Sequence, residues 1–430
     1  MKKLIIGFVL LLIFAYLKKP KESKCSYIPY FQKLNTIIKN EYGGAAHAVL
    51  DLDRLNHNIH QIQKNIGNKF QLRIVTKSLP SLDLIDYIMQ RANTKKLMVF
   101  SETFTKELLE KYKNDSLDIL LGKPLPIEAV KRLSENPKWE QIQWLIDTDT
   151  RLTEYLALAK EKNQRLKIAI EINVGLQRGG LDTPEKLEKI IKFILSNSDY
   201  LELTGLMGYD GHVPYVPFYI NKEKAISKAF KQTQETYNKF VAVIAANYSE
   251  NELNKMTFNS GGSKTYFRYK EYTGKMWVND IAMGSGFVAP YDFSELYAKG
   301  HLPALFLVSP ILKKIENAKL PHVERLSKLI NWWNPNLYNS YFMLGGGWAG
   351  ETIAPTGLYR NTFWDSEPKT VKNILPNQSI LSSSKESHLE VGDYIFTNPW
   401  EGDALLYFRK ILCYQSHQIV GQWNNFEGGN

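Results

Sequence analysis

Residues 45–66, AAHAVLDLDRLNHNIHQIQKNI, join a short apolar run to a helix-like pattern. The run 45–51 has the length and apolar character of a buried strand. After it, apolar residues recur at helical spacing from Leu55 to Ile66, and Asp53 is suited to capping that helix. The stretch therefore predicts one β-strand followed by one α-helix.

The same pattern recurs along the chain, giving eight strand candidates with helical connections. Eight such units predict a (β/α)8 barrel. The rival fold is an open doubly wound sheet, which usually has fewer strands and a glycine-rich first turn, whereas this turn is Asp51-Leu52-Asp53. The other expected strands are 72–76, 97–100, 118–121, 142–146, 168–173, 203–207 and 256–259, and the helical stretches between them are 81–92, 102–113, 126–135, 150–162, 183–196 and 222–247.

The pattern of apolar and turn-forming residues changes after about residue 275. Short apolar runs alternate there with Gly, Pro and Asn, and helical periodicity is scarce. Dense turn signals between short apolar runs indicate strands. We therefore expect the barrel to occupy residues 25–274 and a C-terminal β-rich domain to occupy residues 275–430.

Composition excludes several classes of protein. Hydrophobic residues make up 44% and charged residues 23%, which is typical of a globular chain. Two cysteines are too few for a disulfide scaffold or a Cys-rich zinc module. Half of the net charge of +10 comes from residues 1–24, which hold six lysines and one glutamate. The rest is too dilute for a nucleic-acid surface, so we expect no nucleic-acid partner.

The N-terminus carries a hydrophobic segment. Fourteen largely apolar residues, 4–17, are flanked by lysines on both sides. A membrane span needs about 20 residues, and a signal peptide would end in a small-residue cleavage site, which is missing. We predict that residues 1–24 are an uncleaved membrane anchor, on an undetermined side of the membrane. A cleaved signal peptide and a buried helix are the alternatives.

Chemistry in a barrel is expected at the carboxyl ends of the strands. The loops there offer Lys77, Arg178 and the pair Tyr209 and His212. The loop after the last expected strand, 259–266, reads NSGGSKTY, in which glycines let backbone N–H groups approach a phosphate. A lysine desolvated at a strand end can lose its proton and form a Schiff base. Together, a Schiff-base lysine and a phosphate cradle imply pyridoxal phosphate.

An ordered set of motifs from about 45 to 425 resembles the alanine-racemase-like, fold-type III pyridoxal phosphate enzymes. Within them the chain is most similar to the D-threonine aldolase and D-serine dehydratase-like group, which includes the amino acid deaminase/aldolase branch. The matching stretches are VLDLDRL (49–55), the Lys77 loop, EINVGLQRGG (171–180), GLMGYDGH (205–212), SGGSKTY (260–266), MGSGFVAP (283–290), LEVGD (389–393) and IVGQW (419–423).

The resemblance implies a role for each site residue. Lys77 would carry the cofactor aldimine, Arg178 would lie beside the cofactor ring, and Tyr209 and His212 would line the site. Lys77, Arg178, Tyr209 and His212 are thus the expected catalytic residues. The expected cofactor-binding residues are Lys77, Arg178, Tyr209, Ser260, Gly261, Gly262, Ser263, Gly284 and Ser285.

Two departures from the family pattern stand out. Asn173 replaces the usual aspartate of an Asp-Val-Gly motif. The metal-dependent members carry a His-x-Cys pair late in the β domain, and the matching stretch 396–403, FTNPWEGD, has neither residue. We therefore predict no metal ligands. Glu401 and Asp403 in that stretch are expected to be rim carboxylates, and Arg178 has the alternative of a structural ion pair with Glu171.

The resemblance implies an enzyme that acts on a D-amino or β-hydroxy-amino acid, by aldol cleavage or by elimination. A racemase of the same fold and a non-catalytic pyridoxal phosphate carrier are the alternatives. The family also implies a homodimer and a small amino-acid substrate.

Overall fold

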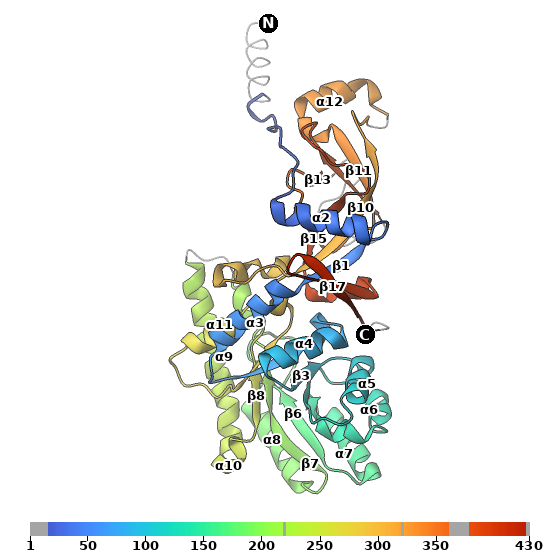
Figure 1. Cartoon of the computed structure of the whole chain (residues 1–430). Helices are drawn as coiled ribbons and strands as arrows, with labels where there is room; N and C mark the ends of the chain where they lie inside the picture. Colours follow the sequence, from blue (N-terminus) through green and yellow to red (C-terminus); the bar gives the residue numbers. More distant parts are fainter. Residues whose placement is uncertain (1–15, 218–220, 320–321, 361–377, 427–430) are drawn as a thin grey trace. The chain divides into compact units, whose positions relative to one another are not determined.

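The computed structural model describes residues 16–217, 221–319, 322–360 and 378–426, and the chain divides into two compact units (Figure 1). The barrel unit comprises residues 53–304, 401–409 and 423–430. The sheet unit comprises residues 1–52, 305–400 and 410–422. Each unit thus contains segments from distant parts of the sequence.

The barrel unit is built on a closed barrel of eight parallel strands, which confirms the predicted (β/α)8 fold. Each strand pairs with the next along the chain, and the ring closes where the first strand pairs with the last. The strands are β2 (Gln71–Val75), β3 (Lys96–Val99), β4 (Asp118–Leu121), β5 (Ile142–Ile146), β6 (Leu166–Glu171), β7 (Leu201–Gly208), β8 (Thr257–Ser260) and β9 (Asp280–Met283).

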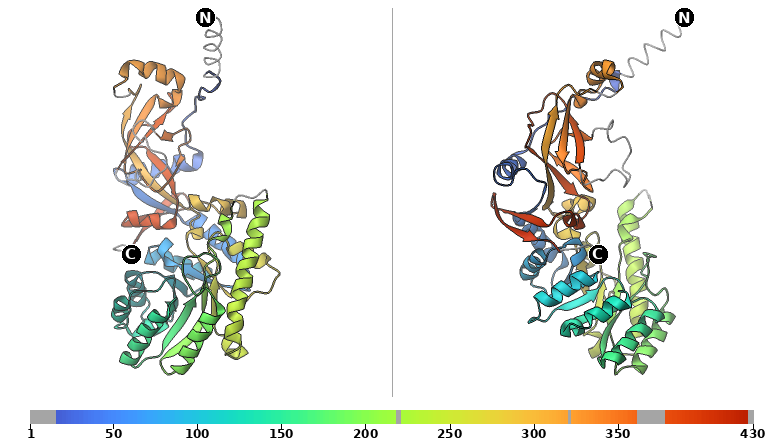
Figure 2. Two further views of the ribbon diagram at one scale, coloured as in Figure 1. Left: turned by 180° about the vertical axis from the view of Figure 1, so that it is seen from behind. Right: turned by 90° about the vertical axis from the view of Figure 1, so that its right-hand side faces the viewer.

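Helices surround the barrel on its outside (Figure 1, Figure 2). Several begin at a polar residue that caps them, as in Ser81, Ser101 and Thr148, whose hydroxyls each accept a backbone N–H of the first turn. Their apolar faces pack inward. The helices are α3 (Leu52–Ile66), α4 (Leu82–Ala92), α5 (Glu102–Lys111), α6 (Ile127–Leu133), α7 (Asp149–Lys162), α8 (Pro184–Ser196), α9 (Lys222–Ala245), α10 (Glu250–Leu253) and α11 (Tyr266–Glu271).

Two strand assignments from the sequence were wrong. The run 45–51 forms β1 (His47–Asp51), which lies in the sheet unit and pairs with strands from the second half of the chain. The eighth barrel strand is instead β9, from the stretch that was expected to begin the β-rich domain. An apolar run followed by a helix does not reveal which sheet supplies its hydrogen-bonding partners.

The sheet unit contains a mixed sheet, which confirms the expected β-rich domain. In the described residues nine strands form it, in the order β13-β14-β11-β10-β1-β16-β17, while β15 pairs with both β10 and β12. The remaining bounds are β10 (Leu305–Ile315), β11 (Asn339–Leu344), β12 (Gly350–Ala354), β13 (Tyr359–Arg360), β14 (Gln378–Ser383), β15 (Tyr394–Pro399), β16 (Lys410–Gln415) and β17 (Gln418–Asn424). The helices of this unit are α2 (Pro29–Glu41) and α12 (Ser327–Trp333).

Helix α2 covers one face of this sheet. Its buried Phe31, Leu34 and Ile38 pack against strand residues that include Phe306 and Phe396. Burying such side chains stabilises the folded state by about 1.5–3 kcal/mol each. The segment before the barrel therefore belongs to the core of the sheet unit, and the observed division differs from the expected boundary between residues 274 and 275.

The predicted membrane association was wrong. None of the helices in the described ranges combines the length and apolar character that crossing a bilayer requires. Residues 4–15 of the expected anchor lie outside the described residues.

Candidate active site

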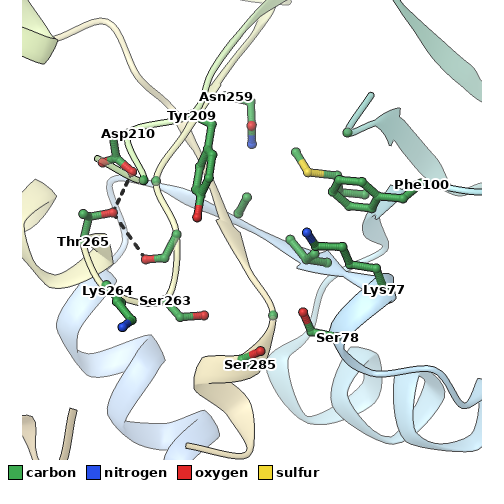
Figure 3. A pocket seen from close by; sticks show the side chains of 18 of the residues that line it. Lys77, Ser78, Phe100, Tyr209, Asp210, Asn259, Ser263, Lys264, Thr265 and Ser285 are labelled. Carbon is green, nitrogen blue, oxygen red and sulfur yellow. Dashed lines mark hydrogen bonds between the residues drawn. The ribbon is translucent and has the colours of Figure 1, made fainter. Parts of the chain in front are cut away.

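A cavity of about 240 Å³ opens where the barrel strands end at their carboxyl side (Figure 3). Its lining comes from residues in or just after β2, β3, β4, β6, β7, β8 and β9, together with Glu401. This is the end of a barrel at which catalytic groups are found. Of the expected site residues, the cavity brings together Lys77, Arg178, Tyr209, Gly261, Gly262, Ser263, Gly284 and Ser285.

Lys77 lies in a single 3-10 turn, η1 (Thr76–Ser78), directly after β2. The hydroxyl of Thr76 donates to the carbonyl of Met98, which fixes this turn to the neighbouring strand. The Lys77 Nζ lies 4.9 Å from the centroid of the Phe100 ring and forms no ion pair within the described part of the chain. The structure therefore presents an amine at the cavity wall that is free to react with a ligand.

The loop after β8 has the geometry of an anion cradle. Gly261 has φ +83°, a left-handed conformation that favours glycine. The backbone N–H groups of Gly262 and Ser263 donate no hydrogen bond to any described residue. The Thr265 N–H bonds the carbonyl of Gly262 at 3.0 Å, which closes the loop. Successive free N–H groups in such a turn bind anions.

A second loop after β9 completes this cradle. The N–H of Gly286 donates to the Ser263 Oγ at 2.8 Å and ties the two loops together. A Cβ on Gly284 would come within 3.1 Å of the Ser78 side chain, so this position favours glycine. Ser285 is buried, and its Oγ accepts the N–H of Gly402 at 3.3 Å.

The buried carboxyl of Asp210 is hydrogen-bonded to the loop that forms the cradle. Asp210 is fully buried and accepts hydrogen bonds from the Thr265 hydroxyl at 2.8 Å and the Tyr269 hydroxyl at 2.7 Å. Burial raises the pKa of Asp210 to about 6. Asp210 was not predicted as a site residue from the sequence. It lies inside the GYDGH motif, and an acidic residue between an aromatic residue and a glycine in that loop could have indicated it.

Arg178 and Tyr209 lie side by side on the cavity wall. The guanidinium of Arg178 lies 5.1 Å from the centroid of the Tyr209 ring. Its Nη2 is also 3.7 Å from Glu171 Oε1, so both the expected cavity position and the alternative ion pair are present. Burial raises the pKa of Tyr209 to about 12, which keeps this phenol protonated at neutral pH.

Two predicted residues do not line the cavity. His212 is packed beside Gly175, with its Nε2 3.5 Å from the Thr233 hydroxyl, and burial lowers its pKa. Ser260 is buried, and its Oγ donates to the carbonyl of Gly208 and lies 2.8 Å from the Tyr269 hydroxyl oxygen. Both side chains are thus placed in the scaffold behind the site.

Lys264 and Asn259 line the cavity and were not predicted. The Lys264 Nζ lies 2.9 Å from the Tyr215 hydroxyl and 3.5 Å from a carboxylate oxygen of Glu295. Lys264 is part of the quoted SGGSKTY motif, and a basic residue in an anion loop was a signal. Asn259 lies in β8, whose sequence is TFNS, and it is the residue of that strand that lines the cavity.

The turn at 401–403 brings two carboxylates toward Lys77. A Cβ on Gly402 would lie 2.3 Å from the carbonyl oxygen of Ser78, so the turn packs closely on η1. Burial raises the pKa of Glu401 and of Asp403, while the charge of Lys77 lowers both. In the described residues, no group of three or more His, Cys, Asp or Glu side chains is arranged to hold a metal ion.

The residues present fit pyridoxal phosphate. A primary amine, Lys77, and an anion cradle at Gly262 and Ser263 face the same cavity. A Cβ on Gly262 would come within 2.9 Å of the Tyr209 ring, so the cradle stays open only because this residue is glycine. A lysine and a phosphate site in one cavity are the two attachments that this cofactor uses.

Comparisons with known proteins agree with this geometry. Residues 50–284, more than half of the chain, match the family described as "Alanine racemase, N-terminal domain". No curated protein matches the chain.

Solved structures share the fold at low sequence identity. D-threo-3-hydroxyaspartate dehydratase from Delftia sp. HT23 is 13% identical with a TM-score of 0.67, over 90% of this chain and 98% of that one. D-threonine aldolase from Filomicrobium marinum is 12% identical with a TM-score of 0.67, over 89% and 94%. Alanine racemase from Bacillus anthracis is 14% identical with a TM-score of 0.63, over 88% and 97%. The chain therefore belongs to the alanine racemase N-terminal-domain family, the fold-type III enzymes that use pyridoxal phosphate.

Proposed function

We propose that this protein is a pyridoxal phosphate-dependent lyase that acts on a D-amino or β-hydroxy-amino acid, by aldol cleavage or by elimination. The observation that carries the proposal is the common cavity of Lys77 and the Gly262–Ser263 cradle. When bound, pyridoxal phosphate supplies an electron sink for charge that develops at the substrate's α-carbon. The family supports the use of this cofactor, and the dehydratase and the aldolase among the similar structures support a lyase reaction.

Each group in the cavity has a task in this proposal. Lys77 holds the cofactor and afterwards carries a proton on its Nζ at one side of the substrate. The N–H groups of Gly262 and Ser263 bind phosphate oxygens, and Lys264 adds positive charge beside them. Arg178 donates hydrogen bonds to an oxygen on the cofactor ring. Tyr209, a protonated phenol, is placed to donate a proton at its hydroxyl.

A racemase is the second candidate, and the position of Tyr209 favours it. Racemisation needs proton-transferring groups on both faces of the substrate, and Tyr209 and Lys77 approach the cavity from different sides in Figure 3. A phenol is protonated at neutral pH even at its ordinary pKa of about 10, so the position of Tyr209 does not make the racemase the first candidate.

We also propose a homodimer, since a closed two-fold pair is the commonest assembly of soluble enzymes. Light scattering at micromolar concentration tests this. A monomer that retains full activity contradicts it.

The cofactor is tested first. The apo-protein is titrated with pyridoxal phosphate, reduced with borohydride and digested, and mass spectrometry locates the modified lysine. We expect the modification on Lys77, its absence in Lys77→Ala, and its retention in Lys314→Ala, a control lysine of the sheet unit that does not line the cavity. Modification elsewhere, or no binding, contradicts the proposal.

The reaction is tested by product identity. The loaded enzyme is offered D- and L-threonine, 3-hydroxyaspartate, serine and alanine. Glycine with an aldehyde identifies aldol cleavage, and a 2-oxo acid with ammonia identifies elimination. Formation of only the opposite enantiomer contradicts the lyase and establishes the racemase.

A further inference from the structure

The floor of the cavity is apolar except at one position. The barrel strands contribute Val75, Met98, Met207 and Ala282 to the lining, and β8 contributes Asn259. Asn259 is therefore the one polar side chain that the described barrel strands place on this floor. It is 1% exposed, so its polar atoms need partners inside the protein or in the cavity.

The amide of Asn259 is held in one orientation. Its Nδ2 donates to Asp280 Oδ1 at 2.6 Å and to the carbonyl of Asp280 at 3.3 Å. Asp280 itself forms a two-pronged ion pair with the buried Arg73, with distances of 2.8 Å and 2.9 Å. A carboxylate paired in this way only accepts hydrogen bonds. If the amide were flipped, Oδ1 would face the Asp280 carboxylate, and two acceptors would meet. Asp280, held by Arg73, therefore keeps Nδ2 on its side and leaves Oδ1 as the atom without a protein partner.

The amide atom that is left without a protein partner, Oδ1, is a hydrogen-bond acceptor. The Oδ1 of Asn259 accepts no hydrogen bond from any described residue, and it is not shut off from the cavity. An amide oxygen accepts and never donates. Leaving such an atom unpaired when a ligand closes the site lowers the affinity for that ligand. A ligand that fills this cavity is therefore expected to bring a hydrogen-bond donor to its floor.

The position of Asn259 identifies which part of the cofactor meets it. Asn259 lies within β8, before the cradle that follows the strand. In Figure 3 it lies at the top of the view and Ser263 and Ser285 lie in the lower part, while Lys77 enters from the right. In pyridoxal phosphate, the phosphate arm and the aldehyde are on adjacent ring carbons. The ring nitrogen is on the far side of the ring from the aldehyde, away from Lys77.

We infer that Asn259 Oδ1 accepts a hydrogen bond from the cofactor's ring nitrogen and so holds that nitrogen protonated, an inference that rests on the proposed function. Asn259 is thus a cofactor-binding residue that sets the protonation state of the ring. A protonated ring withdraws more charge from the substrate, which suits cleavage or elimination at the α-carbon.

The direct test is nuclear magnetic resonance of apo-protein loaded with pyridoxal phosphate labelled with ¹⁵N in the ring. We expect the chemical shift of a protonated pyridine at pH 7.5, with free cofactor titrated as the reference. The shift of an unprotonated ring overturns the inference while the proposed function stands. Failure of the apo-protein to bind the cofactor overturns both.

A binding test removes the donor from the ligand. In 1-deazapyridoxal phosphate a C–H replaces the ring nitrogen, so the wild-type apo-protein should bind it at least about tenfold more weakly than pyridoxal phosphate. Asn259→Leu should bind the two ligands with nearly equal affinity, whereas Met207→Leu, the control on the same floor, should discriminate like the wild type. Equal affinities in the wild type overturn the inference.

Discussion

The ring of Tyr209 lies so close to Gly262 that a Cβ added to the glycine would come within 2.9 Å of the ring. The same ring has Gly211 on another side, where an added Cβ would approach to 2.5 Å, and the guanidinium of Arg178 near its centroid. Tyr209 is therefore clamped by two glycines, and the proposed phosphate loop and the aromatic wall of the cavity constrain each other.

This contact predicts that Gly262→Ala weakens cofactor binding. The methyl group must displace either Tyr209 or the loop whose N–H groups face the cavity. We expect the affinity of the apo-protein for pyridoxal phosphate to fall about tenfold or more, the order of one lost hydrogen bond to a charged group. Equilibrium titration measures it, with Gly421→Ala as the control because no atom lies within 4 Å of a Cβ there. Unchanged affinity in Gly262→Ala would remove this loop from the site.

The buried carboxyl of Asp210 predicts a pH-dependent stability. Its pKa is raised by burial from 3.8 to about 6, against the hydrogen bonds from Tyr269 and Thr265 and the charge of Arg268, which lower it. Between pH 4 and pH 6 the folded protein binds more protons at this group than the unfolded chain does, so the stability it contributes is lost as the pH rises.

Asp210→Asn tests this, because the amide cannot ionise. The free energy of unfolding of the wild type relative to Asp210→Asn should fall by about 2 kcal/mol between pH 4 and pH 6.5. Urea unfolding at several pH values measures it. Stability profiles of the two proteins that run parallel across this range would contradict the raised pKa.

The sequence predicted the barrel because strand and helix periodicities alternate clearly. It did not predict that β1 leaves the barrel, since β1 and β2 have the same apolar character and differ only in their pairing partners. Those partners, β10 and β16, are more than 250 residues away. It also assigned the run that contains β9 to the β-rich domain, although β9 closes the barrel by pairing with β2 and β8.

The sequence predicted which loops form the site, but not which of their side chains face the cavity. Strand ends identified the loops that carry Lys77, Arg178 and Tyr209, but they did not say which neighbouring side chain faces inward. Successive residues of a strand point to opposite sides, so Asn259 lines the cavity while the predicted Ser260 does not. The scaffold position of His212 depends on the 24-residue helix α9, which supplies Thr233 and whose packing no local pattern describes.

Tyr209 and His212 should respond differently to substitution. Tyr209→Phe removes a hydroxyl inside the cavity, and we expect the turnover number to fall by roughly 10²-fold. His212→Gln changes a side chain outside the cavity and should alter the turnover number by less than about threefold. Steady-state kinetics with cofactor in excess measures both. The opposite order of effects would make His212 the proton-transferring group of this loop.

Arg178 should matter more for turnover than for cofactor retention. Its guanidinium is half exposed and lies beside the Tyr209 ring, and its Nη2 is 3.7 Å from Glu171 Oε1. Arg178→Ala should lower the turnover number at least about tenfold and change the cofactor dissociation constant by less than threefold, and Arg178→Lys should recover part of the rate. If Arg178→Ala instead loses the cofactor, Arg178 is mainly a binding residue.

Activity should survive removal of divalent metals. The stretch 396–403 lacks the His-x-Cys pair of the metal-dependent relatives, and its carboxylates, Glu401 and Asp403, lie in the field of the Lys77 ammonium. We expect dialysis against EDTA to change the turnover number by less than about twofold, and added Zn²⁺ or Mn²⁺ to give no gain. The matched measurement is Glu401→Gln, which should be equally insensitive to both metals. Loss of activity in EDTA that Zn²⁺ or Mn²⁺ restores in the wild type but not in Glu401→Gln would show instead that Glu401 is a metal ligand.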